Sequence, residues 1–217
     1  MHLNTMEKIE PFKSSQSDYE YKYEIKKSIF LAESKMVLTV EEADEFIKSI
    51  KEKHPKATHH VSAYSIIHGG LKQKADDDGE PSGTSALPIL KAIELNELQN
   101  IVIVVTRYFG GIKLGAGGLS RAYMAAATGV IEEFGIREFK EYQDIEISFD
   151  YDIYDIFLNY ARNSKIEIID TNFLEQVSVM IRIKLEDVDD VISSVLNISS
   201  GKADIQKKGI ILQWEMK

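Results

Sequence analysis

The sequence predicts an α+β protein of two domains, the first spanning residues 1–138 and the second residues 139–217. Three observations support this prediction. The chain has 217 residues, of which 44% are apolar, so it can build ordinary hydrophobic cores without disulfides. Strand-like and helix-like segments alternate in both parts of the chain. From Glu141 onward they follow the order β-α-β-β-α-β, which is the ferredoxin-like split βαβ pattern.

The first domain is predicted to begin with strands. Residues 19–26 alternate between Tyr or Ile and mostly charged residues, which is typical of a half-buried strand, and a second extended segment follows at 28–32. Thr39 is a suitable N-cap for a helix that we expect to run from about residue 40 to Lys53, before Pro55. The remaining elements expected in this domain are a strand at 63–67, a helix at 84–95, a strand at 101–105 and a helix at 119–134.

Three of these elements carry specific signals. Pro88 falls in the first turn of its helix, where a missing N–H is tolerated. Residues 101–105 are all apolar, which predicts a central strand buried on both faces. Gly135 is a natural end for the last helix.

In the second domain we expect strands at 145–149, 166–170, 177–183 and 210–214, helices at 151–163 and 187–197, and a boundary within 138–142. Residues 1–17 are expected to form a loosely held tail.

Composition excludes several classes of protein. The chain contains no cysteine, which removes disulfides, thiolate metal sites and cysteine nucleophiles. Its formal net charge of −9 argues against a protein that coats nucleic acid, so any polyanionic partner must bind a local basic patch. Neither a signal peptide nor a transmembrane segment is recognisable, and we expect a cytoplasmic protein with no membrane partner and no DNA partner.

The most informative segment is an acidic turn at residues 76–84, which places four carboxylates within five positions. Carboxylates so close together suit Mg²⁺ or Ca²⁺ ligation, acid–base chemistry or recognition of a cationic partner. They also suit a solvated loop whose Asp side chains cap the turn and the helix that follows. The spacing is not that of an EF-hand. The candidate residues here are Asp77, Asp78, Gly79, Glu80, Ser82 and Thr84.

A second turn, at residues 106–123, is basic and rich in glycine. Glycines allow backbone amides to approach a ligand closely and the basic side chains supply charge, so phosphate is the favoured ligand. Neither a Walker A loop nor a dinucleotide fingerprint is present. The structural alternative is a tight connection whose basic residues pair with the acidic turn. The candidate phosphate- or RNA-binding residues are Arg107, Lys113, Gly115, Gly117, Gly118 and Arg121.

Histidines and aromatic residues lie near both turns. His59 and the next residue, His60, should point to opposite faces of a strand, so we expect no shared metal site, while His54 and His68 suit surface or turn roles. A Ser82–His59–Asp77 triad lacks the sequence of a nucleophile elbow. Tyr108 and Phe109 could stack an RNA base or anchor the loop in the core.

These motifs resemble those of the IMPACT/YigZ family. The resemblance rests on residues 77–84, 88–90, 104–119 and 121–123, with Lys27-Ser28-x-Phe30, Ala57-x-His59 and Ala63-Tyr64 upstream. It implies a first domain similar to domain IV of elongation factor G and a ferredoxin-like second domain similar to its domain V. Many relatives carry Cys two positions after the motif His, where this chain has Val61, so a thiol role is not expected. The RWD domain through which eukaryotic members engage the regulator of a starvation-responsive kinase is not recognisable, and kinase control is not expected to transfer whole.

The resemblance and the basic turn together predict a non-catalytic, translation-linked regulator that binds RNA or the ribosome and needs no cofactor. The alternative is a Mg²⁺-dependent nucleotide or phosphate-ester enzyme in which Asp77, Asp78 and Glu80 hold the metal, because the second turn distantly resembles the glycine loop of galactokinase-type kinases. A third hypothesis is that the acidic turn docks a regulatory protein. In each case we expect the two turns to converge on one cleft.

Overall fold

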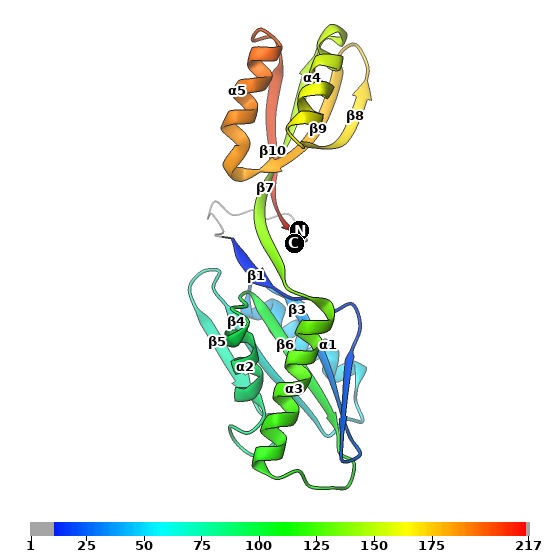
Figure 1. The fold of residues 1–217 in the computed structure, drawn as a ribbon, viewed down its shortest axis with the longest axis vertical. Helices are drawn as coiled ribbons and strands as arrows, with labels where there is room; N and C mark the ends of the chain where they lie inside the picture. Colours follow the sequence, from blue (N-terminus) through cyan, green and yellow to red (C-terminus); the bar gives the residue numbers. More distant parts are fainter. Residues whose placement is uncertain (1–10, 216–217) are drawn as a thin grey trace. The chain divides into compact units, whose positions relative to one another are not determined.

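A computed structural model describes residues 11–215 and divides this part of the chain into two compact units, residues 12–138 and 139–215 (Figure 1). The predicted α+β architecture with two domains is confirmed. Most of the tail predicted at 1–17 lies outside the described residues. Its described part is not loose, because strand β1 (Phe12–Ser14) buries Phe12, and the Gln99 N–H donates to the Lys13 carbonyl at 2.8 Å.

The first unit is built on an antiparallel sheet with the strand order β2-β3-β6-β4-β5. Its strands are β2 (Tyr21–Ile25), β3 (Ser28–Met36), β4 (His59–Ile66), β5 (Lys72–Asp76) and β6 (Ile101–Tyr108). As predicted, β6 is central and its residues 101–107 are buried. Strand β5 was not predicted. Its sequence is mostly charged and exposed, and it is held at the sheet edge only by pairing with β4.

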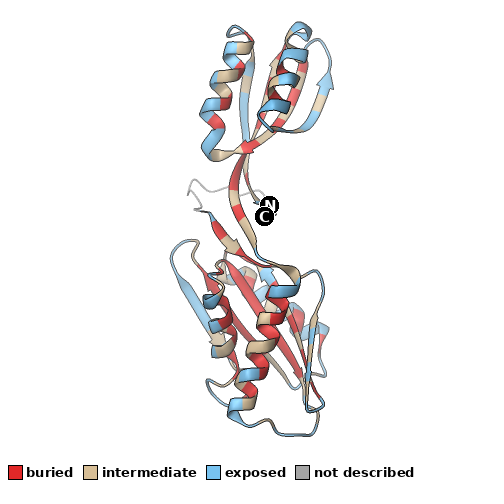
Figure 2. Ribbon diagram, in the orientation of Figure 1, coloured by how far each residue is buried: buried red, intermediate tan, exposed pale blue. Residues whose placement is uncertain are grey.

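Helices cover both faces of this sheet. On one face α2 (Ala86–Leu95) and α3 (Ala116–Phe134) enclose the larger core, in which Phe30 and Tyr123 pack edge to face with ring centroids 5.1 Å apart. On the other face α1 (Val40–Lys53) encloses a smaller core. Figure 2 shows the central strands and the inner sides of α2 and α3 as buried. The domain therefore has three layers, with the sheet in the middle.

Local signals place most helix ends. Thr39 caps α1 as predicted, with its Oγ1 accepting from the Glu42 N–H at 3.1 Å. Gly135 ends α3 with φ +76°. Helix α3 begins at Ala116, three residues earlier than predicted, so that Gly117 and Gly118 belong to its first turn although glycine is a poor helix former. Helix α2 begins two residues later than predicted, at Ala86.

The second unit has the ferredoxin-like arrangement. Its strands follow the order β10-β7-β9-β8, and helices α4 (Tyr151–Asn163) and α5 (Val188–Ile198) pack on them around one apolar core. The strands are β7 (Arg137–Phe149), β8 (Glu167–Phe173), β9 (Val177–Lys184) and β10 (Asp204–Glu215), and a 3₁₀ turn (Leu185–Asp187) precedes α5. Strand β7 is longer than predicted and begins before the expected strand at 145–149, because backbone pairing with β9 extends from Phe149 back to Tyr142. Among the described residues, no helix is long and apolar enough to cross a bilayer.

Candidate functional site

The acidic turn follows β5, and its first candidate carboxylate, that of Asp77, accepts hydrogen bonds from within the protein. Asp77 caps the start of α2 from outside the helix. Its Oδ1 accepts from the N–H groups of Ser85 and Ala86 at 3.0 and 2.8 Å, and its Oδ2 accepts from the Gly83 N–H at 2.6 Å. Three donors saturate this carboxylate and remove from the loop the amides that could otherwise meet an anion. These bonds favour the capping interpretation of Asp77 over metal ligation or acid–base chemistry.

Asp78 is likewise held by neighbouring elements. Its Oδ2 accepts from the His60 N–H at 2.7 Å, its Oδ1 pairs with Lys51 Nζ at 2.8 Å, and its carbonyl oxygen lies 2.8 Å from His59 Nδ1. Burial raises the pKa of Asp78, but the bonds from Lys51 and His60 outweigh it, so the pKa lies below its ordinary value. Gly79, with φ +85°, allows the turn to pass beside the His59 ring.

Glu80 points into the core and forms a buried network with the basic turn. Its Oε1 accepts from Arg107 Nη1 at 2.6 Å and from Tyr123 Oη at 2.7 Å. Both side chains of the ion pair are nearly inaccessible, 6% exposed at Arg107 and 4% at Glu80. Burial, followed by the hydrogen bond to Glu80, raises the pKa of Tyr123 far above its ordinary value and keeps the phenol protonated.

Arg107 is consequently nearly inaccessible, and its ion pair with Glu80 does not favour the predicted role of this residue in binding RNA phosphate. Its guanidinium carbon lies 5.4 Å from the ring centroids of both Phe30 and Phe109, so cation–π contacts cover the group that Glu80 neutralises. Strand position explains the burial: Arg107 belongs to a central strand that is covered on both faces, so either side-chain direction would lead into a core. The structural alternative, pairing between the two turns, holds for this residue.

Two polar residues of the acidic turn contribute little to a ligand site. Ser82 is exposed in the loop. Thr84 Oγ1 donates to the Pro81 carbonyl at 2.6 Å, and the Thr84 carbonyl accepts from Ser120 Oγ at 3.0 Å, which ties the loop to α3. Thr84 therefore shapes the loop.

The basic turn begins with a glycine that close packing requires. A Cβ on Gly110 would overlap the backbone of Lys27, and the Gly110 N–H donates to Ser28 Oγ at 3.1 Å. This contact places the turn between β2 and β3 against the glycine turn.

Further along, Gly115 has φ +70° and is the N-cap of α3, where no side chain caps the first amides. An uncapped helix N-terminus favours an anion.

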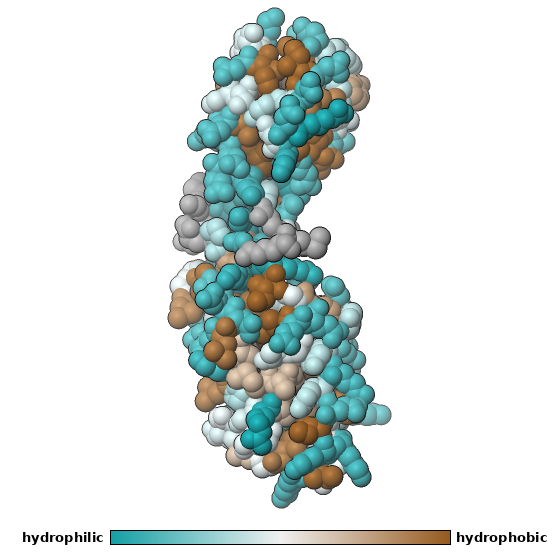
Figure 3. Space-filling view, viewed as in Figure 1, coloured by the Kyte–Doolittle hydropathy of each residue, from teal (hydrophilic) through white to brown (hydrophobic). Residues whose placement is uncertain are grey.

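Four exposed cations gather at this end of the first unit, and we call them the basic end. They are Lys26, Lys27, Lys113 and Arg121. The β2–β3 turn and the loop from β6 to α3 lie at the same end in Figure 1, and hydrophilic side chains project there in Figure 3. Gly117 lies beside the Arg121 guanidinium, because a Cβ added there would be in ordinary contact with Nη1 at 3.6 Å. Lys26 and Lys27 are not among the predicted phosphate-binding residues, because they lie outside the glycine-rich turn, although the Lys27-Ser28-x-Phe30 pattern includes Lys27.

The two turns meet in one pocket, so the expectation that they converge is confirmed. The pocket has a volume of about 420 Å³. Glu80 and Pro81 line it from the acidic turn, and Arg107, Phe109 and residues 113–116 line it from the basic turn. Thr58, His59 and Leu119 complete the lining. His59 Nε2 lies 3.9 Å from Glu80 Oε2. Lys113 is the exposed cation among its lining residues, and the buried Glu80–Arg107 pair also lines it. This arrangement suits an anionic group better than a metal ion.

The remaining aromatic and histidine candidates divide between core and surface. Tyr108 is an anchor, because its Oη lies 3.1 Å from His54 Nδ1, whereas Phe109 is 46% exposed and could meet a base. His54 is buried at the C-cap of α1, so of the surface or turn role predicted for it only the turn role agrees with the structure. His68 is half-buried beside Asn100.

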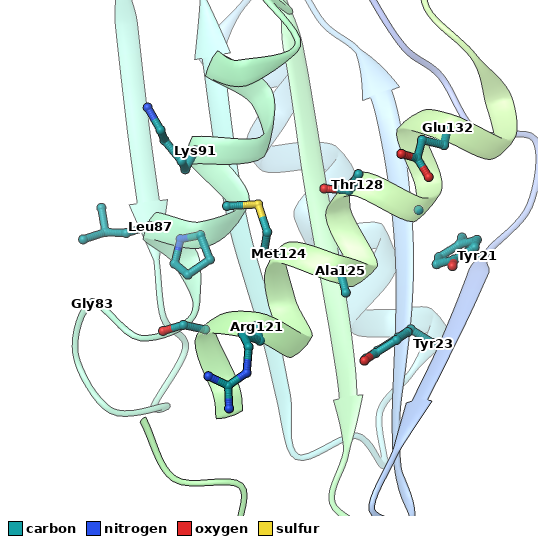
Figure 4. Close-up of a pocket in the computed structure, with 13 residues that line it drawn as sticks. Tyr21, Tyr23, Gly83, Leu87, Lys91, Arg121, Met124, Ala125, Thr128 and Glu132 are labelled. Carbon is teal, nitrogen blue, oxygen red and sulfur yellow. The ribbon is translucent and has the colours of Figure 1, made fainter. Parts of the chain in front are cut away.

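A larger groove of about 800 Å³ runs along the outer side of α3. Figure 4 shows Arg121, Met124 and Thr128 along that helix, with Leu87 of α2 on one side and Tyr23 of β2 on the other. Figure 3 shows apolar side chains over these helices. Arg121 lines the groove and belongs to the basic end, so the two features are continuous.

Comparisons with known proteins match both units. Residues 26–131 match the Impact N-terminal domain, and residues 147–202 match a domain of unknown function called DUF1949. The chain is 37% identical over 188 residues to the IMPACT family member YvyE of Bacillus subtilis, covering 87% of each protein. It is 32% identical to an IMPACT family member of Haemophilus influenzae, over 86% of this chain and 91% of the relative.

Two further similarities are partial or structural. The chain is 41% identical over 102 residues to YigZ of Escherichia coli, which covers 46% of this chain and 50% of that protein. A solved structure titled as that of a hypothetical protein has 25% sequence identity and a TM-score of 0.60, over 91% of this chain and 97% of the other.

Proposed function

Because the chain belongs to the IMPACT family, we propose that it is a non-catalytic, translation-linked protein that binds RNA, free or in the ribosome, through the basic end of its first unit. The observation that carries this proposal is that the acidic turn forms its bonds within the protein, whereas the basic turn exposes cations. The carboxylates of Asp77, Asp78 and Glu80 are satisfied within the protein, while Lys113 and Arg121 are exposed. Among the described residues, neither cation has an ion-pair partner within 4.0 Å.

The basic end suits a phosphate backbone for electrostatic and geometric reasons. Lys26 and Lys27 are fixed beside the glycine turn by the contact with Gly110, so two joined loops supply three of the cations and the first turns of α3 supply Arg121. The uncapped amides of α3 lie between Lys113 and Arg121 in the sequence. Exposed Phe109 and the tyrosines of the groove offer rings on which unpaired bases can stack. An acidic chain can thus bind a polyanion at one place.

The decisive measurement is binding of ribosomes and of a structured RNA at low salt. The double substitution Lys113→Ala and Arg121→Ala removes two exposed charges without touching the core. The matched control is Lys48→Ala with Lys56→Ala, which removes the same charge at and just beyond α1, on the other side of the sheet. We expect the first variant to lose affinity and the control to keep it. Equal affinity in all three proteins, or equal loss in both variants, would refute the proposal.

Salt dependence gives a second readout. Each phosphate contact contributes about 0.7–0.9 to the slope of log K against log salt, so the double variant should bind with a slope shallower by about 1.4–1.8. An unchanged slope would mean that the two cations do not contact phosphate, whatever the affinity.

The alternative of a Mg²⁺-dependent nucleotide enzyme fits these carboxylates less well. Asp77 accepts three backbone bonds, and Glu80 is neutralised by Arg107 in the core. Both would have to leave these partners to ligate a metal. Thermal unfolding with a panel of nucleotides, with and without Mg²⁺, separates the hypotheses: a ligand at 100 times its Kd adds about 2.7 kcal/mol of stability. A Mg²⁺-dependent shift would favour the enzyme.

A further inference from the structure

A second cluster of metal-ligating groups lies in the first unit, away from the glycine turns. It joins Glu20, just before β2, with Glu33 of β3 and His54 at the C-terminal end of α1. One ligating atom from each residue lies within 4.8 Å of the other two. The three come from separate parts of the sequence, so the fold alone creates the cluster. Neither turn contributes to it, and it is independent of the function proposed above.

The histidine provides an observation separate from the carboxylates. His54 is 8% exposed, and its Nδ1 is held by Tyr108 Oη at 3.1 Å. Its Nε2 is buried as well and makes no hydrogen bond of acceptable geometry within the described residues, although Glu20 Oε2 lies 3.1 Å away. A buried polar atom without a partner costs free energy, and such atoms in folded proteins call for an explanation. This Nε2 faces the two carboxylates, and a cation between them would satisfy it.

The distances from the histidine to the two carboxylates are close to those within a coordination shell. His54 Nε2 lies 3.1 Å from Glu20 Oε2 and 3.8 Å from Glu33 Oε1. Nitrogen and oxygen ligands about 2.0–2.2 Å from a tetrahedral Zn²⁺ are separated from each other by about 3.4 Å. The bond between Nδ1 and Tyr108 orients the ring, as second-shell bonds do for metal-bound histidines.

Lys53 supplies the positive charge in the described structure. Its Nζ lies 2.9 Å from Glu33 Oε2 and 3.4 Å from Glu20 Oε2. Its side chain is 45% exposed, so the ammonium can swing into solvent without disturbing the core. The ammonium and a metal ion would compete for the same two carboxylates, which predicts opposite effects from changing Lys53 and changing His54.

We propose that Glu20, Glu33 and His54 bind a divalent first-row transition-metal ion, with Zn²⁺ the best match to one imidazole and two carboxylates, and that the ion displaces the Lys53 ammonium. Three protein ligands leave a coordination position for water. The bound ion ties the end of α1 to β3 and to the segment before β2. Metal binding should therefore raise the stability of the first unit.

The test is titration of the untagged, chelator-treated full-length chain with Zn²⁺ and with Co²⁺, the latter followed by its visible absorption. We expect one ion per chain. H54Q and E20Q should each weaken binding by more than the 10–100-fold typical of second-shell changes, whereas K53M should tighten it about tenfold. H68Q controls for loss of a histidine elsewhere, and H2Q controls for a ligand outside the described residues.

Two outcomes would overturn the proposal. The first is the absence of stoichiometric Zn²⁺ and Co²⁺ binding by the wild-type chain. The second is binding that H54Q and E20Q leave unchanged while H2Q abolishes it. Partly exposed Glu20 keeps the test valid if H54Q fails to fold, and tighter binding by K53M is a gain that structural damage cannot produce.

Discussion

At the scale of single residues, the direction in which a charged side chain points decides its role. Arg107 and Lys113 both belong to the basic turn, yet Arg107 is buried against Glu80 while Lys113 is exposed. Both residues could be identified as candidates from charge and spacing. Only packing distinguishes them, because β6 is covered on both faces and its arginine must find a buried acceptor.

The Tyr123 phenol gives a prediction that depends on pH. Y123F removes the hydrogen bond to buried, charged Glu80 and should lower the free energy of unfolding by about 1.5–3 kcal/mol at pH 7. The pKa of Tyr123 is raised in the folded protein, so above a pH of about 10 the phenol ionises only on unfolding. Wild-type stability should therefore fall as pH rises through this range, and Y123F should lack this contribution.

The measurement is urea unfolding of both proteins between pH 7 and 11. The stability difference between them should shrink as pH rises above about 10. Y151F is the matched control, because it removes an exposed phenol from the second unit and should leave the wild-type pH dependence in place. A constant difference between wild type and Y123F would show that burial does not protect this phenol.

At the scale of elements, the ends of helices and strands depend on partners distant in sequence. Capping by the Asp side chains of the acidic turn was one of the interpretations left open by the sequence, and Asp77 fulfils it for α2 from eight and nine positions away. Helix α3 starts earlier than its apolar pattern indicated, because packing of Leu119 and Ala122 stabilises a first turn that contains glycines. Local pattern was reliable for the middle of each element and less so for its ends.

The Asp77 cap can be tested by substitution. D77A leaves three backbone N–H groups of the acidic turn and α2 without their acceptor and should destabilise the protein by about 1–2 kcal/mol. D77N retains one carbonyl acceptor and should fall between D77A and wild type. D44A, which removes an exposed carboxylate from α1, is the control in urea unfolding. A D77A protein as stable as D44A would exclude the capping role.

At the scale of the whole molecule, the chain builds separate cores in its two units. Phe30 and Tyr123 centre the larger core of the first unit, and Phe149 and Phe157 pack with ring centroids 5.2 Å apart in the second. Each core is closed by its own helices, which leads us to expect that each unit's stability is set mainly by its own packing.

This expectation predicts a selective effect of a core deletion. F157A should destabilise the second unit by about 3–5 kcal/mol, since the ring is fully buried. Native-state hydrogen exchange should then show faster exchange in β7 and β9 and unchanged protection in β6. Y154F, which keeps the ring of a partly buried neighbour on α4, is the control. Equal loss of protection in β6 would mean that the two units unfold together.

The sequence by itself determined the α+β class, the ferredoxin-like order of the second unit, the central strand and the two turns, because periodicity, caps and glycine positions act over a few residues. It also carried the family resemblance. Only the tertiary structure decided which charged side chains form bonds within the protein. It also decided that Lys26 and Lys27 belong to the basic end and that Glu20, Glu33 and His54 lie close together. The physical reason is that burial and pairing depend on contacts between distant segments, which strand register and helix packing create.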